Sequence, residues 1–231
     1  QTFAAPSPAS APTSTPLPSW RDKIAVVPLG LPDRPPATPA EQYWPADAAL
    51  RLLFVGRFSY YKGIDVLIDA KRRLPEDCSL LLVGDGERRE AIACRVASEG
   101  LASRVRFAGQ LDDDELARVY AAAHVLCLPS IERSEAFGVV LLEAMRAGRP
   151  AIATGIVGSG MAEVLGDGQA GLIVSPGNAT ALATAIAQLR HEPALRERLG
   201  TTGRIRFLDR FRIDDVAERI NELYRSLAKN R

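Results

Sequence analysis

Two glutamates stand out in the stretch SEAFGVVLLEAM, residues 134–145, because most of its other residues are apolar. Glu135 precedes the apolar run and Glu143 lies within it, eight positions further on. Eight residues of an α-helix rise about 12 Å and return to roughly the same face. Such carboxylates are too far apart for the close pair of a glycoside hydrolase, but they could contact separate parts of one elongated ligand.

Both glutamates also have structural explanations. Glu135 could cap a helix, and Glu143 could form an ion pair at the surface. The run around Glu143 is apolar on most sides, however, so a carboxylate there needs a polar partner. These surroundings favour a functional role for Glu143.

The helix in this stretch is expected to begin near Ala136, with Phe137, Gly138 and Val139 in its first turn. Backbone N–H groups in the first turn of a helix have no partner within the helix. They point outward and favour anions. We therefore expect an anion-compatible helix terminus beside Glu135.

A second group of candidate residues lies in VGRFSYYKG, residues 55–63, after an apolar run. Gly56 allows a close turn of the backbone, and Lys62 is expected to open the following helix. Cations are unfavourable at a helix N-terminus, so Arg57 and Lys62 suggest an anionic ligand such as a diphosphate. The alternative is two solvated surface cations. The loop is neither a GxGxxG fingerprint nor a Walker loop.

Short apolar strands alternate with helical segments from residue 50 onward, and this alternation predicts parallel βαβ units. We predict an α/β fold, a Rossmann-like doubly wound parallel sheet of about six strands with helices on both faces. The expected strands are 50–56, 79–86, 104–109, 124–130, 150–154 and 170–175, and the expected helices are 62–74, 87–100, 112–123, 136–148, 178–191, 192–208 and 212–229. Ligands bind such sheets at the carboxyl ends of the strands, where both candidate groups fall.

The chain divides into three predicted parts. Residues 1–49 are expected to be linker and inter-domain segment: 1–19 are rich in Pro, Ala and Ser, a short strand covers Ile24 to Val27, and 32–49 form a surface loop. The start lacks the charge pattern of a signal peptide. Residues 50–211 form the domain, and 212–231 a final amphipathic helix.

Composition excludes several classes of protein. Lys and Arg number 29 and Asp and Glu 28, which argues against a general nucleic-acid binder. Three widely spaced cysteines and two isolated histidines predict no disulfide framework and no metal site. No apolar run reaches the roughly 20 residues of a membrane helix. We expect a cytoplasmic protein, with peripheral attachment to the inner face of a membrane as an alternative.

Five stretches together resemble the nucleotide-sugar-binding C-terminal domain of family 4 glycosyltransferases, which have the GT-B fold. They are FVGRFSYYKGIDVLI, LLLVGDGERR, VRFAGQL, LCLPSIERSEAFGVVLLEAMRAGRPAIAT and AGLIVSPGN, and the resemblance covers about residues 50–190. The family's motif of two glutamates separated by seven residues falls on Glu135 and Glu143. The resemblance implies transfer of a sugar from a nucleoside diphosphate with retention of configuration, without a catalytic metal or a cofactor.

The resemblance also implies roles. Arg57 and Lys62 would hold the donor diphosphate, Glu135 would contact the donor sugar, and Glu143 would accept hydrogen bonds from the ribose. The leaving phosphate would accept the acceptor's proton. The implied donor-binding residues are Gly56, Phe107, Gly109, Leu111, Phe137, Gly138, Val139, Val140 and Glu143, with backbone groups of Gly138 and Val139 at the phosphates and 107–111 around the base.

One departure from the family pattern is GIVGSGMAEV at 155–164, where many members have Asp-Val-Gly-Gly and then Pro-Glu. This form resembles a subgroup that builds bacterial surface polysaccharides or glycolipids, often from GDP-mannose. The acceptor, a glycan or a lipid-linked sugar, would be bound by an N-terminal domain that precedes this part in the family. Without it the chain is expected to be inactive or nearly so.

Two other hypotheses remain open. The chain could be a nucleotide-binding module without transferase activity, complementing a separate N-terminal half. It could also be another GT-B enzyme, such as an epimerase or a phosphorylase, although no lysine is suited to anchor pyridoxal phosphate.

Overall fold

A six-stranded, entirely parallel sheet forms the centre of the protein, in the order β5-β4-β3-β6-β7-β8. The computed structural model describes residues 3–5 and 24–229. The strands are β3 (Leu50–Val55), β4 (Cys78–Val83), β5 (Val105–Gly109), β6 (Val125–Leu128), β7 (Ala151–Thr154) and β8 (Gly171–Val174). The order reverses between β3 and β6, as a doubly wound sheet requires. The predicted fold class and strand number are confirmed.

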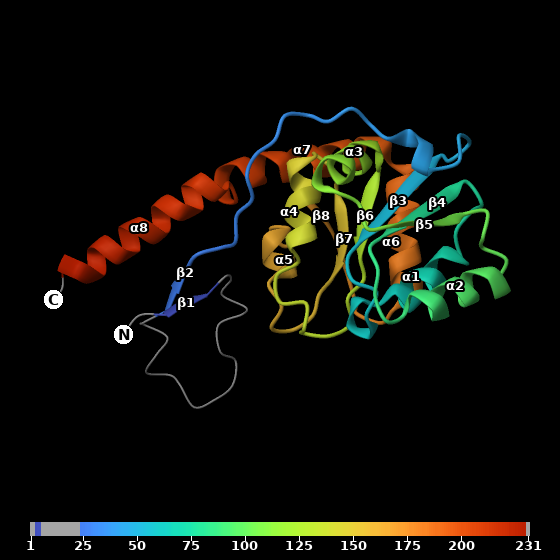
Figure 1. The fold of residues 1–231 in the computed structure, drawn as a ribbon, viewed down its shortest axis with the longest axis horizontal. Coiled ribbons are helices and arrows are strands. Elements are labelled where there is room, and N and C mark those ends of the chain that lie inside the picture. Colours follow the sequence, from blue (N-terminus) through green and yellow to red (C-terminus); the bar gives the residue numbers. More distant parts are fainter. Residues whose placement is uncertain (1–2, 6–23, 230–231) are drawn as a thin grey trace.

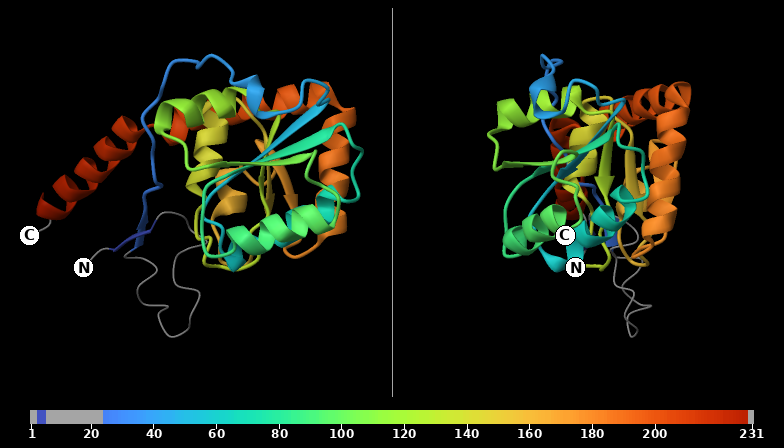
Figure 2. Two further views of the ribbon diagram at one scale, coloured as in Figure 1. Left: turned by 45° about the vertical axis from the view of Figure 1, so that its right-hand side comes forward. Right: turned by 90° about the vertical axis from the view of Figure 1, so that its right-hand side faces the viewer.

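Helices cover both faces of the sheet (Figures 1 and 2). Helices α1, α2 and α6 pack on one face, α3, α4 and α5 pack on the other, and α7 contributes to both cores. Their bounds are α1 (Ile64–Lys71), α2 (Arg89–Ser98), α3 (Asp113–Ala122), α4 (Val139–Arg146), α5 (Met161–Val164), α6 (Ala179–His191) and α7 (Pro193–Arg210). The four-residue helix α5 was not predicted.

Strand β3 shows why the strands of this sheet are mostly apolar. Leu52 and Phe54 enter the core beneath α1, α2 and α6, whereas Leu53 and Val55 enter the core beneath α3, α4 and α5. Side chains alternate between the faces of a strand, so a strand covered on both sides is apolar at most positions. Arg51 is the exception in β3, and it forms an ion pair with Glu41 at 2.9 Å.

Backbone hydrogen bonds continue from the sheet into the loops at its carboxyl edge. The loop after β3 is bonded to the loop after β4 by Phe58 N–H to the Asp85 carbonyl, 2.8 Å. It is bonded to the loop after β6 by Ile131 N–H to the Tyr61 carbonyl, 2.8 Å. Loops that carry candidate site residues are therefore fixed to one another.

The segment 32–49 differs from the predicted surface loop. Residues Glu41–Tyr43 form a 3₁₀ turn, and the indole N–H of the buried Trp44 donates to the Leu52 carbonyl at 3.1 Å. The N–H of the buried Ala40 donates to the Arg118 carbonyl. A large aromatic side chain in a proline-rich stretch anchors it to the core, because burying it removes apolar area from water.

The two ends of the described chain lie beside each other, away from the sheet (Figure 1). Strands β1 (Phe3–Ala5) and β2 (Ile24–Val26) form a parallel pair, and α8 (Ile213–Lys229) extends outward. The predicted final helix is confirmed. Of the predicted linker, residues 1–19, the structure describes only 3–5, which form strand β1. None of the described helices combines the length and apolar character that a membrane span needs.

Gly63 lies where the loops after β3 and β6 pack closely against each other. It has a φ of +67°, and a Cβ there would lie 2.1 Å from the Pro129 carbonyl oxygen. Gly100 has a similar φ of +70° but no atom within 4 Å of such a Cβ. We expect Gly100→Ala to lower the free energy of unfolding by roughly 1–2 kcal/mol through backbone strain alone. Gly63→Ala should lower it clearly further, as measured by urea denaturation. Equal losses would contradict this packing.

Candidate functional site

An ion pair between Lys62 and Glu135 lies at the centre of the carboxyl edge. Lys62 ends the 3₁₀ turn Tyr60–Lys62 after β3, and Glu135 lies in the loop after the neighbouring strand β6. Lys62 Nζ donates to Glu135 Oε2 at 2.5 Å, and only about a tenth of each side chain is exposed. Residues 73 positions apart are thus joined where ligands bind sheets of this kind.

Two serines hold the loop that carries Glu135. Ser130 Oγ donates to the same carboxylate oxygen at 3.2 Å, and Ser159 Oγ donates to the Glu135 backbone carbonyl at 2.5 Å. Both are buried. Sequence reasoning missed both roles, although Ser130 directly follows a strand and Ser159 lies in the unusual Gly-Ser-Gly segment. Their hydrogen bonds fix both the side chain and the backbone of Glu135.

Gly56 and Arg57 border this ion pair in different ways. A Cβ on Gly56 would lie 3.6 Å from Lys62 Nζ, so the glycine leaves the space beside the ammonium open. Arg57 is largely exposed and its Nε contacts Glu87 Oε2 at 3.3 Å. It lines a shallow pocket formed by Gly56, Arg57, Gly84, Asp85, Gly86 and Gln110. The structure therefore joins Lys62 to Glu135, whereas Arg57 faces the loops after β4 and β5.

Two expectations about helix starts are wrong. Helix α4 begins at Val139, not near Ala136, because Gly138 has a left-handed φ of +77° and separates the loop from the helix. Glu135 thus lies outside the helix, and the two glutamates do not share a helical face. Lys62 likewise precedes α1, which begins at Ile64 after the left-handed Gly63. In both places a left-handed glycine separates the charged residue from the start of the helix that follows.

Glu143 lies on the second turn of α4, half-buried, with a polar partner that the sequence did not reveal. The hydroxyl of Tyr120 at the end of α3 donates to Glu143 Oε2 at 2.7 Å. Burial raises the pKa of Glu143, while the Tyr120 hydrogen bond and the Arg146 guanidinium partly offset that rise. Burial beside this carboxylate also raises the pKa of Tyr120 well above its ordinary value.

The remaining predicted residues lie on two sides of the sheet. The ring of Phe107 packs 6.2 Å from that of Phe58, and Leu111 packs against the opposite core. Gly109 accepts from Gly84 N–H through its carbonyl. The side chains of Phe107 and Leu111 each pack against a core on one side and stay partly exposed on the other.

At the start of α4, Phe137 is buried against Phe211, with ring centroids 6.4 Å apart. Val139 is exposed, whereas Val140 is partly buried. Only the backbone of Phe137 is therefore available to a ligand. Helix α4 begins four residues after Glu135, and the first N–H groups of a helix, which lack a partner within it, favour anions.

The edge as a whole combines cations, helix N–H groups and a fixed carboxylate. Such a set can bind a polyanion and orient a polar group beside it. Within the described residues, no group of three or more His, Cys, Asp or Glu side chains is arranged to hold a metal ion.

Comparison with known proteins agrees with this fold. O-antigen chain mannosyltransferase C of Escherichia coli is 32% identical, with 99% of this chain and 62% of that protein covered. Phosphatidyl-myo-inositol mannosyltransferase of Mycobacterium leprae is 37% identical, covering 77% of this chain and 46% of that protein. The solved structure of sucrose-phosphate synthase from Thermosynechococcus elongatus superposes with a TM-score of 0.79 at 34% identity, over 90% of this chain and 54% of that one.

The chain thus spans about half the length of these relatives. The family described as Glycosyl transferases group 1 matches residues 44–206, which include the whole sheet and both candidate loops. Because the match covers most of the chain and the fold agrees with it, this protein belongs to the group 1 glycosyltransferase family.

Proposed function

We propose that this chain is the donor-binding part of a retaining glycosyltransferase that takes a hexose from a nucleoside diphosphate sugar. The observation that carries the proposal is the buried pair of Lys62 and Glu135 at the carboxyl edge of the sheet, beside the start of α4. A pair of this kind is of little value for stability, since apolar residues often replace one without loss. Its position therefore favours a role toward a ligand.

The cations at the carboxyl edge of the sheet would attract a negatively charged diphosphate leaving group. In the transfer, the bond between the sugar C1 and the diphosphate oxygen breaks and a bond from an acceptor oxygen to C1 forms. Negative charge develops on the diphosphate as that bond breaks. Lys62, Arg57 and the N–H groups at the start of α4 would stabilise this charge, the kind of electrostatic effect that contributes most in many enzymes.

Glu135 would contact the donor sugar, and no protein base is required on this part of the enzyme. The acceptor's proton would pass to the leaving phosphate oxygen, on the same face of the sugar as the attack. Glu135 is bonded to Lys62, so one ammonium would serve both the carboxylate and the diphosphate. Glu143, one turn into α4, would accept hydrogen bonds from the ribose.

A hexose donor is supported by the names of relatives, which include two mannosyltransferases and a D-rhamnosyltransferase. We propose a GDP-mannose-like donor, with a UDP-sugar as the alternative, and an acceptor used in cell-surface polysaccharide or glycolipid synthesis. The acceptor would be a glycan or a lipid-linked sugar, held by a preceding N-terminal domain that the relatives' greater length leaves room for.

A double substitution separates binding from folding. Lys62→Met alone should destabilise the chain, because it leaves Glu135 buried without its partner. Lys62→Met with Glu135→Gln should restore the midpoint of urea denaturation. We expect the double variant to bind GDP and UDP roughly 10–100-fold more weakly in isothermal titration, as the loss of a charge-assisted hydrogen bond predicts.

The matched control is the pair Asp77 and Arg190, which lies at the opposite, amino end of β4. Asp77→Asn with Arg190→Gln also removes one positive and one negative charge that form an ion pair. This double variant should leave the affinity for nucleotides unchanged. Affinity that is equal in the unaltered chain and the Lys62 and Glu135 double variant would refute the proposed diphosphate site.

A second candidate function is a nucleotide-binding module that is inactive by itself. The chain spans only 62% and 46% of the length of two mannosyltransferase relatives, which favours this possibility. Mixing the chain with a separately produced N-terminal half of a relative, followed by assay of sugar transfer from GDP-mannose, tests for a transferase part; a mixture that binds GDP but transfers no sugar would favour the module. We expect turnover only when both halves are present. Turnover by the chain without the added half would contradict the division of labour proposed here.

A further inference from the structure

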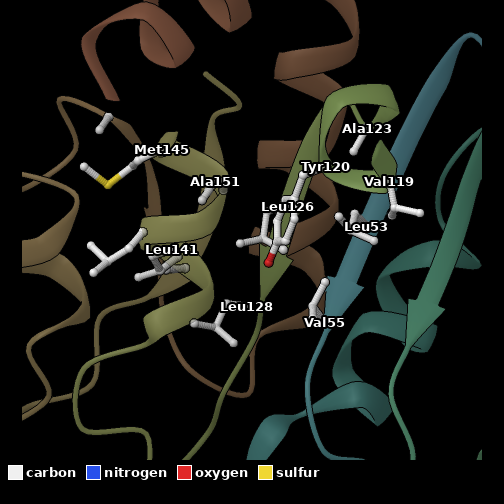
Figure 3. Packing of buried hydrophobic residues seen from close by; sticks show 14 of the residues in the cluster. Leu53, Val55, Val119, Tyr120, Ala123, Leu126, Leu128, Leu141, Met145 and Ala151 are labelled. Carbon is white, nitrogen blue, oxygen red and sulfur yellow. The ribbon is translucent and has the colours of Figure 1, made fainter. Parts of the chain in front are cut away.

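Tyr120 is a buried polar residue to which the proposed function gives no role. It lies near the end of α3 and is only 1% exposed. Its ring belongs to the core between the sheet, α3 and α4, together with Leu126 and Leu141 (Figure 3). A phenylalanine would fill the same apolar space. The hydroxyl is therefore the part of Tyr120 that packing does not explain.

The hydroxyl of Tyr120 has one good acceptor. It donates to Glu143 Oε2 at 2.7 Å, a short bond of the kind that a charged acceptor gives, whereas the Val140 carbonyl is 3.4 Å away. A glutamate side chain has three rotatable bonds, and this contact fixes its end. The Tyr120 hydroxyl bonds only to Oε2, so Oε1 of Glu143 makes no hydrogen bond to Tyr120.

Glu143 also faces open space. Glu143 and Tyr120 both line a pocket between the carboxyl-terminal parts of α3 and α4, to which segment 34–39 and Arg204 of α7 also contribute. A carboxylate that is held by one oxygen and lines a pocket can present its other oxygen to a ligand hydroxyl. Preorganised acceptors bind better because the cost of ordering them is already met by the fold.

The titratable groups that act on the pKa of Glu143 come from α3, α4 and the segment before β3, and Arg204 of α7 lines the same pocket. Tyr120 and Asp113 face it from α3, Arg146 from α4, and Arg34 from the segment before β3. Burial raises the pKa of Glu143, whereas the Tyr120 hydroxyl, Arg146 and Arg34 lower it and Asp113 raises it further. A carboxylate with a raised pKa takes up its proton at a higher pH than an ordinary glutamate, so loss of the Tyr120 hydroxyl should widen the pH range in which Glu143 is neutral.

We propose that Tyr120 is a positioning residue that holds the Glu143 carboxylate so that its free oxygen accepts a hydrogen bond from the ribose of a nucleoside diphosphate. This inference rests on the proposed function, because it assigns Glu143 to the ribose. It assigns Tyr120 no contact with the ligand. Its effect should therefore appear only in properties that depend on the ribose hydroxyl and on Glu143.

The test compares GDP with 2′-deoxy-GDP, and UDP with 2′-deoxy-UDP, by isothermal titration. The unaltered chain should prefer the ribonucleotide roughly 10–100-fold, as one hydrogen bond to a charged group predicts. Tyr120→Phe and Glu143→Gln should each reduce this preference to a few-fold. Affinity for the deoxynucleotides and for inorganic pyrophosphate should stay nearly constant, which also reports that the variants are folded.

Tyr43→Phe is the matched control, because the Tyr43 hydroxyl also interacts with a carboxylate of α3, that of Glu115. It should keep the full preference for the ribonucleotide. Carbon-13 NMR of labelled glutamate provides a readout without ligand, in which Tyr120→Phe should raise the pKa of Glu143 and Tyr43→Phe should not.

The outcomes are distinguishable. A preference lost in Glu143→Gln but intact in Tyr120→Phe overturns the positioning role and leaves the proposed function standing. An unaltered chain that binds none of the nucleotides overturns both the proposed function and the inference that rests on it. A pKa of Glu143 that is unchanged in Tyr120→Phe would also overturn the inference.

Discussion

The rest of the candidate site depends on the buried contact between Lys62 and Glu135. The contact joins the loops after β3 and β6, neighbours in the sheet but 73 residues apart in the chain. Bringing two charges out of water costs several kcal/mol per ion, and their attraction offsets this only with good geometry and further hydrogen bonds. Ser130 supplies one such bond, and the backbone of Glu135 is held separately by Ser159.

A parallel sheet makes this contact possible, because it brings the carboxyl ends of all its strands to one edge. Hydrogen bonds between the loops after β3, β4 and β6 then limit how far the charged groups can move. The helices on both faces fix the starts of α1 and α4 against that edge, with left-handed glycines at the two transitions. Rigid elements of this kind place a site more reliably than free loops do.

Much of the fold could be predicted, since apolar runs such as that of β3 and the alternation with helices define a parallel α/β sheet. Glu143 could be chosen as a candidate because a carboxylate is costly in an apolar run, and Lys62 because a cation is unfavourable near a helix start. Glu135 could be chosen from its position just before the expected helix, eight residues before Glu143. The starts of α1 and α4 could not be placed, because they depend on the left-handed backbone of Gly63 and Gly138. Partners such as Tyr120 were missed because they come from distant positions that no local pattern connects. The roles of the site residues toward a ligand stay predictions.

The most direct test of the central claim is a crystal structure of the chain with GDP or UDP bound. The account predicts a phosphate oxygen within hydrogen-bonding distance of Lys62 Nζ, further phosphate contacts from the first N–H groups of α4, and a ribose hydroxyl at Glu143. A nucleotide bound elsewhere, with the contact between Lys62 and Glu135 closed and untouched by phosphate, would contradict it.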